Sequence, residues 1–162
     1  MASVVNPNKA RAARVKREFD RWAASRIDDI NRLDFYGAQA LVHRTMVESG
    51  ECFVRRVTRA DLAVPLGIVV LEPDWLDTTK GTLGIEYSSE GKPTGYWMYA
   101  AAPSSVSDYG LRNSTLIPAS DVIHVYRVDR PGQRRGVSWF APITIDLHDF
   151  DGYEDAVLLR AK

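Results

Sequence analysis

Few side chains in this sequence have the type and spacing of a catalytic or metal-binding site. The three histidines, His43, His124 and His148, lie far apart, and none has the i, i+4 spacing of a zinc-binding helix. Cys52 is the single cysteine, which excludes an intramolecular disulfide and any cluster of cysteine ligands. His124 falls on one face of an alternating segment, so we interpret it as a satisfied core or interface histidine rather than a catalytic base.

The acidic residues near the C-terminus do not match the spacing of a known metal-binding or catalytic motif. A calcium loop is excluded because Leu147 and Leu158 would occupy its first and last ligand positions. The carboxylates of residues 146–155 could form an acid–base pair, or join His124 in a small metal-dependent hydrolase, but any acidic helix face offers the same groups. Ser138 lacks the second glycine of a nucleophile elbow and is better explained as a helix cap. We therefore predict no enzymatic activity and no catalytic, cofactor-binding or metal-binding residue.

Three arginines in one turn form a more specific candidate. Arg130, Arg134 and Arg135 lie close together in the sequence, and a guanidinium can bind phosphates or carboxylates with two parallel hydrogen bonds. We predict that they contact a neighbouring subunit's Asp and Glu side chains, with phosphate binding as the alternative.

Composition restricts the class of protein. With 162 residues, 45% of them apolar, and four tryptophans, the chain can bury the core of one folded domain. Lys plus Arg equals Asp plus Glu at 21 each, so no overall charge attracts it to nucleic acid or membrane. No apolar run approaches the roughly 20 residues that span a bilayer, and the N-terminus lacks the pattern of a signal peptide. We expect a soluble, intracellular protein.

Residues 8–26 have the pattern of a basic amphipathic helix. The apolar stripe follows helical spacing and consists of Ala12, Val15, Phe19 and Trp22. Six basic and two acidic residues lie between Lys9 and Arg21. Such a helix can bind a phosphate backbone, which makes a nucleic-acid-binding module an alternative function. The balanced charge of the whole chain favours a solvated face instead.

The middle of the chain changes from helix to strand. Asp34 is a suitable N-cap for a helix that ends at Gly50, with Phe35, Ala38, Leu41, Val42 and Thr45 on its inner face. Apolar and alternating runs then predict strands at residues 51–59 and 66–72, and a hairpin formed by residues 82–87 and 94–100. Residues 101–120 are rich in Ser, Pro and Gly, so we expect a surface loop there.

The last part of the chain reads as a strand, a tight loop and a long helix. Residues 122–128 alternate as a buried strand does. Pro131 and Gly132 then form a type II turn signal. Ser138 and Pro142 suit the first turn of a helix over residues 137–162, and we expect Trp139 and Phe140 to be buried where the loop meets the sheet. The predicted fold is α+β, with N-terminal helices, a mixed or antiparallel sheet with a hairpin, and a long C-terminal helix.

Several short segments resemble one family in the expected order. The clearest are RPGQRRGVSW at residues 130–139, DGYEDA at 151–156 and RAK at 160–162. SGEC at residues 49–52, LEPDWL at 71–76, GIEYSSEGKPTGY at 84–96 and IPASDVIH at 117–124 fit the same pattern. Together these segments, which run from about residue 35 to 162, resemble the portal proteins of tailed bacteriophages, lambda-type family.

The resemblance implies a structural function. Portal proteins form a ring, typically of twelve subunits, at one capsid vertex, and double-stranded DNA passes through it during packaging and ejection. Terminase, capsid proteins and head–tail adaptors are the expected partners, with no membrane and no cofactor. The implied location is the virion, with assembly in the host cytoplasm. On this basis residues 1–33 form a basic helix and linker, 34–136 an α+β wing-like domain, and 137–162 a helix leading toward the ring's stem.

Overall fold

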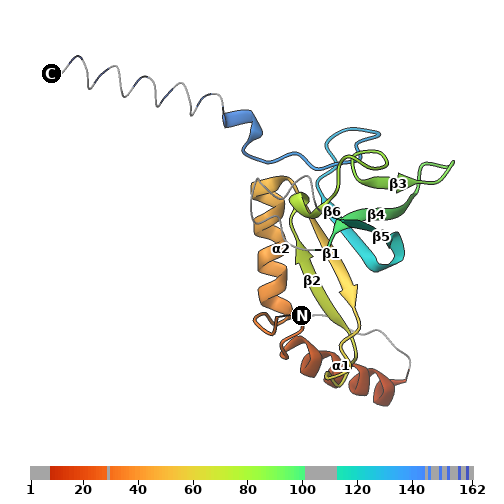
Figure 1. Cartoon of the computed structure of the whole chain (residues 1–162). Coiled ribbons are helices and arrows are strands. Elements are labelled where there is room, and N and C mark those ends of the chain that lie inside the picture. Colours follow the sequence, from red (N-terminus) through yellow and green to blue (C-terminus); the bar gives the residue numbers. More distant parts are fainter. Residues whose placement is uncertain are drawn as a thin grey trace.

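A computed structural model describes residues 8–28, 30–100 and 113–144, and single residues 146, 150, 153, 157 and 160. Over these ranges the chain forms two α-helices and two three-stranded antiparallel sheets (Figure 1). The α+β class is therefore confirmed. Within the part of the chain that the structure describes, no helix is long and apolar enough to cross a membrane.

Helix α1 (Lys9–Ala23) uses its apolar stripe to pack at one end of the molecule (Figure 1). The Asn8 side chain caps it by accepting a hydrogen bond from the Arg11 backbone N–H at 3.1 Å. Trp22, Ala23 and Ile27 are buried at its C-terminal end. The indole N–H of Trp22 donates to the Leu66 carbonyl at 2.7 Å, which satisfies the polar atom of this buried ring.

Helix α2 (Phe35–Ser49) begins and ends where its caps predict. Asp34 accepts a hydrogen bond from the Gly37 N–H at 2.7 Å, and Gly50 ends the helix in the left-handed conformation with φ +87°. Ala38 is buried on the inner face, but Leu41 is exposed, so the predicted inner face is too wide. Helix α2 packs beside β1 (Figure 1).

The first sheet has the order β2–β1–β6, with both neighbours antiparallel to the central strand. Its strands are β1 (Glu51–Val57), β2 (Gly67–Leu71) and β6 (Val122–Tyr126). Glu51 pairs with Tyr126 and Phe53 with His124. Because side chains alternate along a strand, this register places Glu51, Phe53 and His124 on one face. That face carries the polar cluster described below.

The second sheet has the order β3–β4–β5, formed by β3 (Ile85–Tyr87), β4 (Pro93–Tyr99) and β5 (Ser114–Pro118). The predicted hairpin is confirmed. The surface loop predicted for residues 101–120 is wrong at its C-terminal end, because Ser114–Pro118 pairs with β4 along its whole length. Long-range pairing outweighs the turn-rich composition of this segment. Residues 101–112 lie outside the described part of the chain.

One apolar core joins the two sheets. Phe53, Leu71 and Val122 of the first sheet pack against residues of the second sheet. These are Ile85, Tyr96 and Met98, and Leu76 from the segment after β2 completes the cluster. Phe53 is fully buried, and its ring contacts Tyr96 edge to face at 5.6 Å. Burial of a phenylalanine of this kind contributes about 1.5–3 kcal/mol.

The segment after β6 does not start the α-helix that its sequence predicts. Residues 137–140 are not helical, and the first helical turn is a 3₁₀ turn, Ala141–Ile143. The prediction that Ser138 caps the helix is wrong, because the residue at the N-cap is Phe140 and no side chain caps the turn. The Ser138 hydroxyl instead accepts a hydrogen bond from the Phe140 N–H at 3.1 Å. Two i+3 hydrogen bonds hold this segment, from the Ala141 N–H to the Ser138 carbonyl at 3.1 Å and from the Ile143 N–H to the Phe140 carbonyl at 3.0 Å. Most of the predicted helix beyond residue 144 lies outside the described residues.

Candidate functional site

Residues 129–140, here called the arginine loop, cross between the two sheets and the end of α2. The loop starts with the predicted turn, in which Gly132 has φ +77° and the Gln133 N–H donates to the Arg130 carbonyl at 3.3 Å. The Gln133 side chain holds the turn from inside. Its oxygen accepts from the Asp129 N–H at 2.7 Å, and its amide nitrogen donates to the Arg135 carbonyl at 2.9 Å.

Glu51 fixes the far end of the arginine loop. One carboxylate oxygen accepts from Nε of Arg135 at 2.6 Å, and Nη2 of Arg135 contacts the same oxygen. The other oxygen accepts from the Gly136 N–H at 2.8 Å and lies 2.9 Å from Nε2 of His124. The Glu51 side chain is only 3% exposed. These donors join the start of β1, strand β6 and the loop at one carboxylate.

The electrostatics of Glu51 depend on these donors. Burial by itself raises the pKa of a carboxyl group because it removes water from the charged form. Hydrogen bonds from His124, Arg135 and the Gly136 N–H, together with the positive charge of Arg135, outweigh this effect and lower the pKa of Glu51 to about 2. The carboxylate is therefore ionised at neutral pH. Because an ionised carboxylate only accepts hydrogen bonds, the His124 Nε2 atom is the donor.

His124 is a satisfied core histidine, as predicted. Its side chain is 8% exposed and stacks on Phe53 with ring centroids 4.4 Å apart. Tyr126 contacts the ring from the next position of the same face at 4.4 Å, and its hydroxyl donates to the Gln133 carbonyl at 3.1 Å. His43 lies on α2 with its ring 6.4 Å from that of Trp139, and His148 lies outside the described residues.

Two glycines allow the arginine loop to approach the end of α2. A Cβ atom on Gly136 would stand 2.1 Å from the Gly50 carbonyl oxygen, and one on Gly50 would stand 2.3 Å from the Val137 carbonyl carbon. Both distances are too short for real contacts with a backbone. The loop and the α2–β1 junction therefore touch backbone to backbone, as only glycine permits.

The three candidate arginines have different surroundings. Arg135 is bound within the chain, because it also donates to the Leu83 carbonyl at 2.7 Å and so links Glu51 to the segment before β3. The Arg134 guanidinium lies 4.3 Å from the centre of the Tyr87 ring and is exposed. Arg130 is exposed at the turn. Arg130 and Arg134 are thus available on the surface, whereas Arg135 is a link within the fold.

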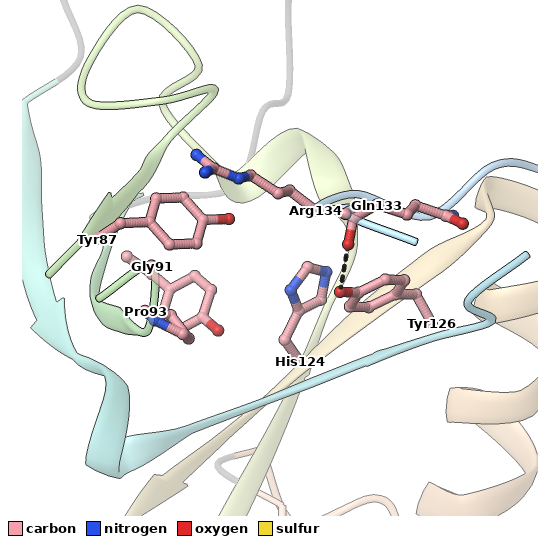
Figure 2. Close-up of a pocket in the computed structure, with 9 residues that line it drawn as sticks. Tyr87, Gly91, Pro93, His124, Tyr126, Gln133 and Arg134 are labelled. Atoms are coloured by element: carbon pink, nitrogen blue, oxygen red, sulfur yellow. Dashed lines mark hydrogen bonds between the residues drawn. The ribbon is translucent and has the colours of Figure 1, made fainter. Parts of the chain in front are cut away.

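A cavity of about 460 Å³ opens between the arginine loop and the β3–β4 hairpin. Figure 2 shows Tyr87 and Arg134 on one side of it and His124 with Tyr126 on the other. Tyr96 also lines this cavity. The pKa of its hydroxyl is raised to about 12, mainly by burial and to a smaller extent by the charges of Tyr87, Tyr126 and Glu51. The hydroxyl is neutral at physiological pH and cannot act there as an anionic base.

A second buried carboxylate lies outside this cavity. Asp77 accepts hydrogen bonds from the hydroxyls of Ser114 and Thr79, each at 2.5 Å. Burial raises its pKa, but these hydrogen bonds outweigh that effect and the pKa is lowered. Asp77 thereby ties β5 to the segment between β2 and β3, which is a structural role.

Trp139 and Phe140 are not buried as predicted. The two residues are 39% and 48% exposed. The Trp139 backbone N–H donates to the Val47 carbonyl at 3.2 Å, which places the residue beside the C-terminal end of α2. Its ring lies under the Arg127 guanidinium at 4.8 Å. Val137 and Ile143 are also exposed beside them, so this end of the loop presents an apolar surface.

The geometry of the cluster is that of a structural scaffold. Every oxygen of Glu51 is occupied by donors of the chain itself, and no group of three or more His, Cys, Asp or Glu side chains in the described ranges could hold a metal ion. The carboxylates of residues 149, 151, 154 and 155 lie outside those ranges. The contacts of Glu51 and Arg135 hold the arginine loop against both sheets.

Sequence patterns alone did not identify Glu51, Gln133 or Gly50 as partners of the arginine loop. One signal was present, since alternation along residues 51–57 places Glu51 on the same face as Phe53. The structure also brings together three of the motifs that carry the family resemblance. Residues 49–52 contact residues 135–139, and residues 84–96 contact Arg134 through Tyr87.

Comparison with known proteins gives one consistent result. A family model for "Phage portal protein, lambda family" matches residues 2–162, which includes the N-terminal helix that the motifs above did not cover. A curated relative, the "Probable portal protein" of Halomonas phage phiHAP-1, is 26% identical over 159 residues. That alignment covers 91% of this chain and 31% of the relative. The chain thus spans about a third of the relative's length.

Proposed function

This chain belongs to the lambda family of phage portal proteins, and we propose that it forms the outer, wing part of a subunit in the portal ring at one capsid vertex. In this role it contributes structure to the channel through which double-stranded DNA is packaged and ejected. The observation that carries the proposal is the family match over residues 2–162. Terminase, the capsid shell and head–tail adaptors are the partners of the complete ring, which assembles in the host cytoplasm and stays in the virion.

The construction of the arginine loop supports a structural rather than an enzymatic role. A ring subunit has to present its contact surface in one fixed orientation, because the same contact repeats around the ring. Glu51, Arg135 and the glycine contact fix the arginine loop in this way without using any group that could react with a substrate. The small hydrolase considered from the sequence required His124 to converge with the acids of residues 149–155. In the structure His124 donates to Glu51 and is almost fully buried.

We propose that the exposed end of the arginine loop contacts the adjacent subunit. Its apolar side chains are Val137, Trp139, Phe140 and Ile143, here called the loop face. Exposed aromatic residues beside arginines have the composition of interface centres. Arg130 and Arg134 are free to reach acidic side chains of the neighbour, which is the role predicted for the arginine cluster, while Arg135 stays within its own subunit.

The proposal is tested by changing the loop face in the complete portal protein. Trp139→Ala together with Phe140→Ala should strongly reduce ring formation in native mass spectrometry. The melting temperature of the 162-residue chain should fall less than it would on loss of a core aromatic such as Phe53, because Trp139 and Phe140 are 39% and 48% exposed. Tyr36→Ala is the matched control, since it removes an exposed aromatic ring from the start of α2. Normal rings from the double variant would refute the proposed contact.

A further inference from the structure

One side of α1 carries a row of arginines. Arg11, Arg14, Arg17 and Arg21 fall within an arc of about 120° when each residue turns the helix by about 100°, and all four are exposed. We call them the arginine face. The row is about 15 Å long at the rise of an α-helix. The centre of the arginine face lies about 120° around the helix from the centre of the apolar stripe, whose residues Phe19 and Trp22 pack in the core.

These arginines have few partners within the chain. Among the described residues, the one ion pair of Arg21 is a long contact of 3.8 Å with Glu18. Arg11, Arg14 and Arg17 form no ion pair with any side chain in the ranges that the structure describes. By contrast, Arg44, Arg56 and Arg127 each pair with an acid. The arginine face is therefore a local concentration of unneutralised positive charge on a chain whose net charge is zero.

Helix α1, which carries this charge, packs against the rest of the chain through aromatic side chains. Phe19, Trp22 and Phe35 form an aromatic cluster with centroid separations of 5.4–5.9 Å. Trp22 is buried there and Phe19 packs with it, so that Val15 is the one residue of the apolar stripe that is exposed, at 45%. A single valine is much less than the apolar face with which an amphipathic helix enters a bilayer. The arrangement thus favours a soluble polyanion over a membrane surface.

We propose that the arginine face of α1 binds the phosphate backbone of double-stranded nucleic acid without reading its sequence. An α-helix with its side chains is about 10–12 Å wide, and the major groove of B-DNA is about 12 Å wide. A guanidinium can bind a phosphate with two parallel hydrogen bonds, and several arginines in a row can reach successive phosphates. This inference does not rest on the portal ring, and either proposal can fail without the other.

The test measures binding of the 162-residue chain to a fluorescent duplex of random sequence by anisotropy, over a range of salt concentrations. We expect weak, sequence-independent binding that falls steeply with salt, at about 0.9 in the logarithmic slope for each phosphate contacted. The variant Arg11→Gln, Arg14→Gln, Arg17→Gln should lower that slope by roughly 2–3. Circular dichroism establishes that the variant is folded.

The matched control removes the same charge elsewhere. Arg44→Gln, Arg56→Gln, Arg127→Gln takes three exposed arginines that already pair with acids, and it should keep the wild-type slope. An equal decrease of the salt-dependence slope in both triple variants would overturn the proposal, because it would indicate general attraction by charge. Absence of salt-dependent duplex binding would also overturn it, as would equally tight binding to polyglutamate or to vesicles with anionic lipids.

Discussion

Glu51 is the residue on which the arginine loop depends. Placing a carboxylate in the interior costs several kcal/mol of hydration, which has to be offset by hydrogen-bond donors and positive charge. Here His124, Arg135 and the Gly136 N–H provide both, and they come from three separate parts of the chain. The charged residue is thus a junction for segments that are far apart in the sequence.

Replacing Glu51 by Gln should destabilise the chain at neutral pH by roughly 3 kcal/mol, the free energy that corresponds to lowering the pKa from 4.5 to about 2. The amide NH₂ of Gln would meet a donor wherever it points, either Arg135 or the Gly136 N–H. Urea denaturation measures the free energy of unfolding. The control is Glu48→Gln, which removes an exposed pair with Arg44 and should cost below about 0.5 kcal/mol.

The difference between wild type and Glu51→Gln should depend on pH. The folded-state pKa of Glu51 is depressed, so its contribution is fully present above about pH 4.5 and is lost as the pH falls toward 2. Asp61 and Asp77, whose pKa values are also lowered, are common to both proteins, so the difference isolates Glu51. A difference that is the same at pH 2.5 and pH 7 would contradict this account of the junction.

At the scale of elements, the decisive contact is the backbone crossing of Gly50 and Gly136. Gly136→Ala should move the arginine loop away from α2 and cost about 1–3 kcal/mol through overpacking. Because the move also weakens the Gly136 N–H bond to Glu51, its effect should not add to that of Glu51→Gln. A double-mutant cycle in urea should give a coupling above about 0.5 kcal/mol.

Gly91→Ala provides the control for this cycle. Gly91 has φ +78° but nothing within 4 Å of the added Cβ, so alanine there introduces backbone strain without a clash. Its effect should add to that of Glu51→Gln. Additive behaviour of Gly136→Ala as well would mean that the crossing and the carboxylate stabilise the chain independently.

Elements specified by local chemistry were predictable from the sequence. Asp34 and Gly50 mark the ends of α2, and Pro131 with Gly132 mark the turn of the arginine loop. Each of these residues determines the conformation of itself or of residues at most three positions away, so the local sequence is sufficient. The hairpin and the first sheet's strands follow from alternation. The strand Ser114–Pro118 was missed because its pairing with β4, rather than its composition, determines its conformation.

The candidate site was only partly predictable for the same reason. The sequence singled out the arginine cluster and correctly placed His124 in the core. It could not show that Arg135 turns inward to Glu51, across 84 positions of the sequence, while Arg130 and Arg134 stay at the surface. It was also wrong for Trp139 and Phe140, since their exposure depends on where the loop meets the end of α2, a contact between residues far apart in the sequence.

At the scale of the whole molecule, the chain forms two sheets joined by one core, with the loop face and the arginine face at different places on the surface. It spans about a third of the length of a related portal protein, and on the portal proposal it would supply only part of a subunit's contacts. Stable interfaces generally bury more than about 1,000 Å². We expect the 162-residue chain to remain a monomer or a loose small oligomer in light scattering coupled to gel filtration. A discrete species near twelve times 18.1 kDa would show instead that this portion suffices for ring assembly.

The claim that this chain is the wing part of a portal ring is tested most directly by imaging. Cryo-electron microscopy of the complete portal protein should show a closed ring in which Trp139 and Phe140 lie between adjacent subunits. The Glu51–Arg135 contact should be present within every subunit, because it positions the loop before the neighbour binds. A complete protein that forms no ring, or a ring whose loop face points to solvent throughout, would contradict the account.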